Sequence, residues 1–343
     1  MPIRSLCKKA WNQRLALAVD RPGGLSLPQG PAPSGAARLA LRTLVRRTAD
    51  ALLLCAAMAA ALHGLQLDRA QELYQRTQYR EALRLLEASR EKTAPIYDLL
   101  GKCYYRLEEF SKATDAFEKA VEAEPRNANF WNWLGKAYGR RAETSVFFNA
   151  PRYAVRAREH FEKAVSLDPQ NREALSDLFE YYLEAPGFLG GGLEKAADLS
   201  ERIRNLDPAR YQAMQARLAE KRKDFAQAEQ FWRRAVELAP AEPGPSSPAG
   251  RDGIRAGRLA DLARFLARQK RFPESDAAFE QAAKLAPDKA DLKFSRAQTY
   301  LDSKRNQDLA RRLLEAYLQS SLTPEDPPRA EAERLLRSIG RPG

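Results

Sequence analysis

The sequence predicts an all-α fold: a right-handed superhelical solenoid of helical hairpins with a C-terminal capping helix. Two observations lead to this prediction. First, helix-forming residues dominate the 343 positions, charged residues make up 30 %, and the β-branched runs typical of strands are missing. Second, one pattern of small, aromatic and proline residues recurs along the chain, which indicates a repeat architecture. A hydrophobic fraction of 44 % is enough to bury a core along such an array.

The pattern is clearest in residues 94–125, where its positions are Leu100, Gly101, Tyr104, Ala113, Phe117, Ala120 and Pro125. Gly101 and Ala113 are small because two helices are expected to cross closely there. The rings of Tyr104 and Phe117 should fill the space between successive hairpins. Pro125 cannot continue a helix and therefore ends the second one.

The same offsets recur in the next segment at Leu134, Gly135, Tyr138, Ala157, Phe161, Ala164 and Pro169. Five such matches in phase resemble the tetratricopeptide repeat over about residues 66–340. The segments 181–196 and 317–336 are also similar to those of exported bacterial proteins with this repeat. The predicted hairpins span residues 66–93, 94–127, 128–170, 171–209, 210–241, 254–288 and 289–326, with a linker at 242–253 and a polar cap at 327–340.

Two hairpins are longer than the repeat requires. About ten residues are added between Gly135 and Ala157, and about five between Phe179 and Ala196. We expect both insertions in the loops between paired helices, where Phe147, Phe148 and Phe188 are candidate contact residues. The run Gly190–Gly191–Gly192 lacks the Lys-Ser/Thr pair of a phosphate-binding loop, so it indicates left-handed backbone geometry and close packing.

Residues 1–63 are expected to form a basic disordered tail followed by a signal-like apolar segment. Arginines precede the twelve-residue apolar run 51–62, which ends in small residues, as in a secretory signal. The run is short for a membrane span, and any membrane association is expected only through it. This pattern predicts a periplasmic or secreted protein. A signal at this position is expected if the true start lies near Val45. The alternatives to a signal are a retained membrane anchor and a helix that caps the array in a cytoplasmic protein.

Charge and cysteine content exclude several other classes. Residues 1–63 hold nine basic and two acidic residues, which accounts for most of the net charge of +12. The remaining residues are almost balanced, so no nucleic-acid partner is predicted. Cys103 is the one cysteine after residue 63, which leaves no internal disulfide framework.

No catalytic, metal or cofactor site is predicted. The two histidines, His63 and His160, have no companions at zinc-ligand spacing, and no HExxH or Gly-x-Ser-x-Gly motif occurs. The carboxylates are spread along helix faces, where they normally stay solvated.

The resemblance therefore implies a non-enzymatic scaffold or adaptor that binds a protein or extended peptide on the concave face formed by the first helices. The alternative is a cytoplasmic peptide-sensing regulator, although no DNA-binding module is present. The order of groove residues differs from that of the repeat domains that grip chaperone tails. The candidate groove residues are Asp98, Lys102, Tyr105, Asn129, Asn132, Lys136, Glu173, Ser176, Glu180, Arg210, Arg217 and Arg264.

Overall fold

The computed structural model describes residues 65–146, 148–239 and 248–339, with the side chains of 248–252 excepted. The predictions for residues 1–63 and for Phe147 lie outside these residues. No β-strand occurs in the described ranges. Their helices also do not combine the length and the apolar character that a membrane crossing requires.

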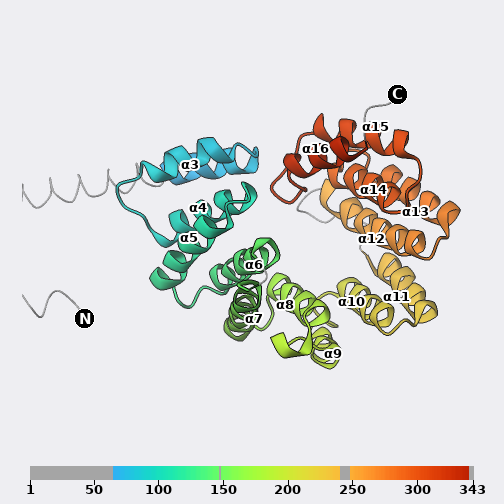
Figure 1. The fold of residues 1–343 in the computed structure, drawn as a ribbon, viewed down its shortest axis with the longest axis horizontal. Helices are drawn as coiled ribbons and strands as arrows, with labels where there is room; N and C mark the ends of the chain where they lie inside the picture. Colours follow the sequence, from blue (N-terminus) through green and yellow to red (C-terminus); the bar gives the residue numbers. More distant parts are fainter. Residues whose placement is uncertain (1–64, 147, 240–247, 340–343) are drawn as a thin grey trace, which may run out of the picture. The chain divides into compact units, whose positions relative to one another are not determined.

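Within these ranges the chain forms successive helical hairpins, closed by a last helix (Figure 1). The first helix of the first hairpin covers residues 65–75. The other first helices are α4 (Ala94–Arg106), α6 (Ala128–Thr144), α8 (Arg172–Glu184), α10 (Pro208–Lys221), α12 (Pro248–Arg268) and α14 (Ala290–Asp302). The second helices are α3 (Tyr79–Glu87), α5 (Phe110–Ala123), α7 (Ala150–Leu167), α9 (Leu193–Glu201), α11 (Phe225–Leu238), α13 (Phe272–Leu285) and α15 (Gln307–Leu318). The helix α16 (Arg329–Ser338) packs on α15, and the predicted all-α array of stacked hairpins is confirmed.

The small residues lie where the two helices of a hairpin cross. A Cβ atom on Gly101 would be 2.6 Å from Cε1 of Phe117, and one on Gly135 would be 2.6 Å from Cδ1 of Phe161. Phe117 is fully buried and stacks on Trp133 of the next hairpin, with ring centroids 5.9 Å apart. The repeat pattern therefore reports both the crossing within a hairpin and the packing between hairpins.

Side-chain caps start several of the first helices. The side chains of Asn171 and Asp207 each accept a hydrogen bond, at 3.0 Å, from the backbone amide three residues ahead. These bonds satisfy amides that have no partner inside the helix. Pro208 follows Asp207 and is the first residue of α10, where the N–H that proline lacks would have no partner inside the helix.

In each described hairpin that carries no insertion, the first helix ends at a residue with left-handed backbone geometry. This residue lies seven positions after the small residue at the helix crossing, and in none of these hairpins is it glycine. The next amide donates to the carbonyl five residues back, as from Glu109 to Tyr104 at 2.9 Å, which closes the helix end. The residues with positive φ at this position are Thr77, Glu108, Lys223, Lys270 and Lys304.

The first insertion differs from the prediction. Helix α6 has 17 residues against 13 in α4, and α7 has 18 against 14 in α5. Eight of the ten added residues therefore extend the two helices, and only residues 145–149 lie between them. The added Ala, Arg and Glu residues favour helix, and Pro151 is tolerated in the first turn of α7.

The second insertion does lie between the paired helices. It forms the short 3-10 helix η1 (Gly187–Leu189), which packs on α7, and the glycines that lead into α9. Gly190 is left-handed with φ 89°, and a Cβ on Gly191 would be 1.8 Å from the carbonyl oxygen of Ala185. The structural interpretation of this glycine run is confirmed.

The predicted linker at 242–253 is also partly wrong, because α12 begins at Pro248. Proline fits the start of a helix, so the residues from 248 onward belong to the first helix of the next hairpin.

Candidate functional site

Three cavities follow one another along the first helices. The α6–α8 cavity has a volume of 430 Å³, the α8–α12 cavity 610 Å³ and the α12–α14 cavity 470 Å³. Glu180 and Glu184 line both the first and the second cavity. Arg210, Arg258, Asp261 and Arg264 line both the second and the third. The three cavities therefore adjoin one another, and we call them together the first-helix groove.

At the α4–α6 end of the groove, two lysines flank a tryptophan. Asp98 accepts an ion-pair contact from Lys102 at 2.6 Å on the same helix. The ammonium groups of Lys102 and Lys136 lie 5.3 Å and 4.7 Å from the centroid of the Trp133 ring. Cation–π attraction holds both lysines near the ring, while Tyr105 packs edge-on against it.

Helices α6 and α8 are joined by polar contacts, most of them partly buried. Asn132 donates to Asp177 at 2.7 Å, and Lys136 forms ion pairs with Glu173 and with Asp177, the latter at 3.2 Å. Burial lowers the pKa of Lys136, but the two carboxylates outweigh it and raise the pKa above its ordinary value. Lys136 therefore remains charged and holds the two helices together.

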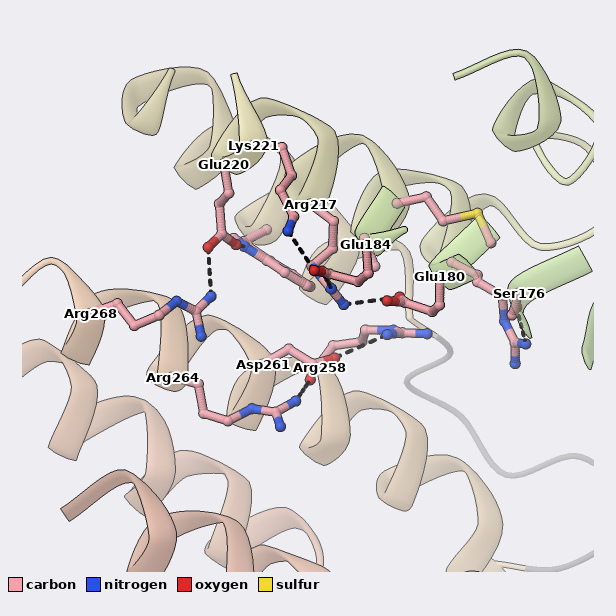
Figure 2. Close-up of a pocket in the computed structure, with 14 residues that line it drawn as sticks. Ser176, Glu180, Glu184, Arg217, Glu220, Lys221, Arg258, Asp261, Arg264 and Arg268 are labelled. Carbon is pink, nitrogen blue, oxygen red and sulfur yellow. Dashed lines mark hydrogen bonds and ion pairs between the residues drawn. The ribbon is translucent and has the colours of Figure 1, made fainter. Parts of the chain in front are cut away.

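The α8–α12 cavity contains a second cross-helix network (Figure 2). Arg217 of α10 contacts Glu180 at 2.9 Å and Glu184 at 3.0 Å, and Lys221 contacts Glu184 at 2.5 Å. Burial raises the pKa of the Glu184 carboxyl, but Lys221 and Arg217 outweigh it and hold the pKa below its ordinary value. The carboxylates of α8 are thus neutralised by cations of α10.

Helix α12 contributes three arginines to the same cavity (Figure 2). Arg268 reaches Glu220 of α10 at 2.6 Å. Arg258 and Arg264 both contact one carboxylate, Asp261, which lies on their own helix. In total, six basic side chains and four carboxylates line this cavity, so it has an excess of positive charge.

Seven of the twelve candidate groove residues line the cavities, namely Tyr105, Lys136, Ser176, Glu180, Arg210, Arg217 and Arg264. The other five, which line none of these three cavities, are Asp98, Lys102, Asn129, Asn132 and Glu173. Asp98 and Asn132 are only 9 % and 2 % exposed. Asp98 pairs with Lys102 on its own helix, and Asn132 contacts Asp177 of α8.

Several groove residues were missed in the sequence. Glu184, Lys221 and Arg268 lie four positions after predicted groove residues, so they occupy the next turn of the same helix face. That spacing is the signal that could have identified them. To identify Asp261 from the sequence, the register of α12 must be known, and that register is hard to assign because α12 follows a linker of irregular length.

The two candidate loop residues that the structure describes, Phe148 and Phe188, line none of the three cavities. Phe148 is 90 % exposed and Phe188 is 82 % exposed. The hydroxyl of Tyr181 donates to the carbonyl of Leu189 at 2.9 Å, which ties η1 to α8. Leu189, rather than Phe188, lines the α6–α8 cavity.

His160 and Cys103, the described histidine and cysteine, both lie in packed surroundings. In the part of the chain that the structure describes, no cluster of three His, Cys, Asp or Glu residues could hold a metal ion. His160 packs between the rings of Trp131 and Tyr138, and burial lowers its pKa to about 4. Burial raises the pKa of the Cys103 thiol to about 12, so this cysteine is a poor nucleophile.

Known proteins share this repeat. Two tetratricopeptide repeat family models match residues 94–127 and residues 260–328. The tetratricopeptide repeat domain-containing protein PYG7, chloroplastic, of Arabidopsis thaliana is 30 % identical over 108 residues, which are 30 % of this chain and 33 % of that protein. Anaphase-promoting complex subunit 3 of Dictyostelium discoideum is 41 % identical over 61 residues, or 17 % of this chain and 6 % of that protein. The chain thus spans a third or less of these relatives.

Among solved structures, a tetratricopeptide repeat protein from Parabacteroides merdae matches with a TM-score of 0.50 and 14 % identity. The match covers 81 % of this chain and 98 % of that one. At this identity the likeness concerns the fold alone.

Proposed function

Because this chain is a tetratricopeptide repeat protein, we propose that it is a non-enzymatic scaffold or adaptor that holds an extended segment of a partner protein in the first-helix groove. Repeat arrays of this kind support protein interactions, since each added hairpin lengthens one surface. The observation that carries the proposal is the row of three adjoining cavities along α6, α8, α10, α12 and α14.

The charges of the α8–α12 cavity favour an acidic partner segment. Its six cations exceed its four carboxylates, and Arg258 and Arg264 share Asp261. A carboxylate of the partner could contact Arg264 without breaking an ion pair between helices. Such complementarity contributes specificity and association rate more than affinity.

Arg264→Glu is therefore the most informative groove variant. It reverses a half-exposed charge whose ion pair with Asp261 lies within α12, so the helix contacts of the groove should survive. The matched control is Lys163→Glu, which reverses an exposed charge on the second helix α7.

The wild-type chain and both variants would be used to capture proteins from envelope and cytoplasmic fractions of the native organism, with identification by mass spectrometry. The captured partner would then be titrated calorimetrically. We expect Arg264→Glu to weaken binding by about 1 kcal/mol or more, roughly fivefold, and Lys163→Glu to leave it unchanged. Equal affinities for all three chains would remove the groove as the binding surface.

We also propose that the protein works in the bacterial cell envelope. The support is the basic, apolar and small-residue order of positions 42–62. Capture of the partner from the envelope fraction would support this proposal, and capture from the cytoplasmic fraction would contradict it. Neither result depends on whether the groove is the binding surface.

A further inference from the structure

An aromatic pair that closes one hairpin is absent from the next. In the hairpin of α4 and α5, Tyr105 packs edge-on against Phe110, with ring centroids 5.6 Å apart. The equivalent positions in α6 and α7 are Gly139 and Ala154, four residues after Gly135 and three before Ala157. The second-helix position is otherwise held by large side chains in the hairpins from α3 to α13: Tyr79, Phe110, Leu193, Phe225 and Phe272.

The α6–α8 cavity occupies the space that this pair would fill. Gly139, Ala142 and Ala154 leave room along its lining, and Tyr105, Tyr181 and Leu189 contribute larger apolar surfaces. Six charged side chains also line the cavity. Its volume of 430 Å³ lies in the range of about 300–1,000 Å³ that ligand pockets occupy.

The packing of α6 does not require glycine at position 139. A Cβ atom there would meet nothing within 4 Å, whereas one on Gly101 or Gly135 would strike a buried ring. Glycine inside a helix costs about 1 kcal/mol relative to alanine. Gly139 thus destabilises its helix and leaves an opening at the surface.

We propose that this cavity receives one large apolar side chain, aromatic or leucine, from the partner segment. The inference rests on the proposed function. The cavity meets the α8–α12 cavity at Glu180 and Glu184, so one extended chain can place an apolar side chain here and its acidic residues against Arg264. The partner is therefore an acidic segment with an apolar anchor.

The test uses substitutions of lining residues whose larger side chains fill the cavity. Gly139→Leu places a side chain into open space, so it should fold, and Ala154→Phe restores a ring by an independent route. Lys163→Leu adds the same leucine side chain on the exposed surface of α7 as a control. A phage-displayed library of random peptides about twelve residues long is selected on the full wild-type chain, and the enriched peptides are titrated against each variant.

We expect enriched peptides to contain acidic residues and one aromatic or leucine anchor. Changing the anchor to alanine should weaken binding to the wild type about tenfold or more. The same change should have almost no effect on binding to Gly139→Leu, because the anchor then has no cavity to enter. Lys163→Leu should behave as the wild type does.

Different failures have different meanings. If Arg264→Glu weakens binding but Gly139→Leu and Ala154→Phe do not, the anchor cavity is refuted and the groove stands. If none of these groove variants weakens binding, or if no peptide is enriched, the result counts against the proposed function as well. If the wild-type chain dimerises and Gly139→Leu makes it monomeric, the occupant is a second copy and the proposal is overturned.

Discussion

Gly101 and Gly135 offer a direct test of how the hairpins pack. A Cβ at Gly101 would lie 2.6–2.8 Å from three ring carbons of Phe117, well inside van der Waals contact. Phe117 is fully buried and stacks on Trp133, so its ring cannot retreat without moving the next hairpin. Gly101→Ala therefore overpacks the core, at a cost of about 1–3 kcal/mol.

Gly139→Ala is the matched control. All three glycines lie inside a helix, where alanine gains about 1 kcal/mol over glycine. At Gly139 the gain stands alone, because the added carbon meets nothing within 4 Å. The difference in unfolding free energy between Gly101→Ala and Gly139→Ala should therefore equal the overpacking cost of about 1–3 kcal/mol, and Gly135→Ala should resemble Gly101→Ala.

Urea unfolding followed by circular dichroism and tryptophan fluorescence measures these differences. Trp133 stacks on Phe117, so its fluorescence reports on the strained region. If all three variants gained stability equally, the small residues would have no packing role at the helix crossing, and the register of the repeat would be wrong.

Three other predictions concern separate parts of the chain. Lys223→Gly should raise the unfolding free energy by about 1 kcal/mol, because Lys223 is held at φ 62° and glycine adopts that conformation without strain; no gain in urea unfolding would contradict this. Burial lowers the pKa of His160 to about 4 in the folded chain. Between pH 6.5 and 4 His160 therefore takes up a proton only in the unfolded chain, so the unfolding free energy falls as the pH falls. His160→Gln should reduce the loss of unfolding free energy between pH 7 and 4.5 by about 2 kcal/mol, and an unchanged pH dependence would refute this. A fusion of residues 44–65 to a reporter enzyme active only outside the cytoplasm should be active, and replacing Leu53 and Leu54 by Arg should abolish the activity; a silent native fusion would argue for the capping-helix alternative.

The repeat pattern predicted the packing because it consists of contacts within and between neighbouring hairpins. The offset from Gly101 to Phe117 is the contact itself, since a Cβ on the glycine would strike that ring. The left-handed turn was not predicted, because Glu108 and Lys223 are not residues that normally mark it. Only their constant distance of seven residues from the crossing position carries that signal.

The groove contacts were harder to predict than the hairpin packing, because they join residues that are far apart in sequence by intervals that vary between repeats. Asn132 and Asp177 are 45 residues apart, and the interval contains the first insertion. The repeat register places Asn132 and Asp177 on neighbouring first helices, but it does not show which side chains meet across them. The insertion proved to be mostly helix, and the small residues Gly139 and Ala154 acquire meaning only when compared with Tyr105 and Phe110.

The position of the charges also decides where a partner can gain affinity. Lys136 is committed to Glu173 and Asp177, so a partner carboxylate would have to compete with a cross-helix ion pair that stabilises the array. Arg264 contacts Asp261 on its own helix, and Arg258 shares that carboxylate, so a new contact there leaves the hairpin interface intact. Variants of Lys136 should therefore lower stability first and binding only as a consequence, whereas variants of Arg264 should lower binding with stability unchanged. A charge in the groove is available for recognition only to the extent that the fold does not already use it.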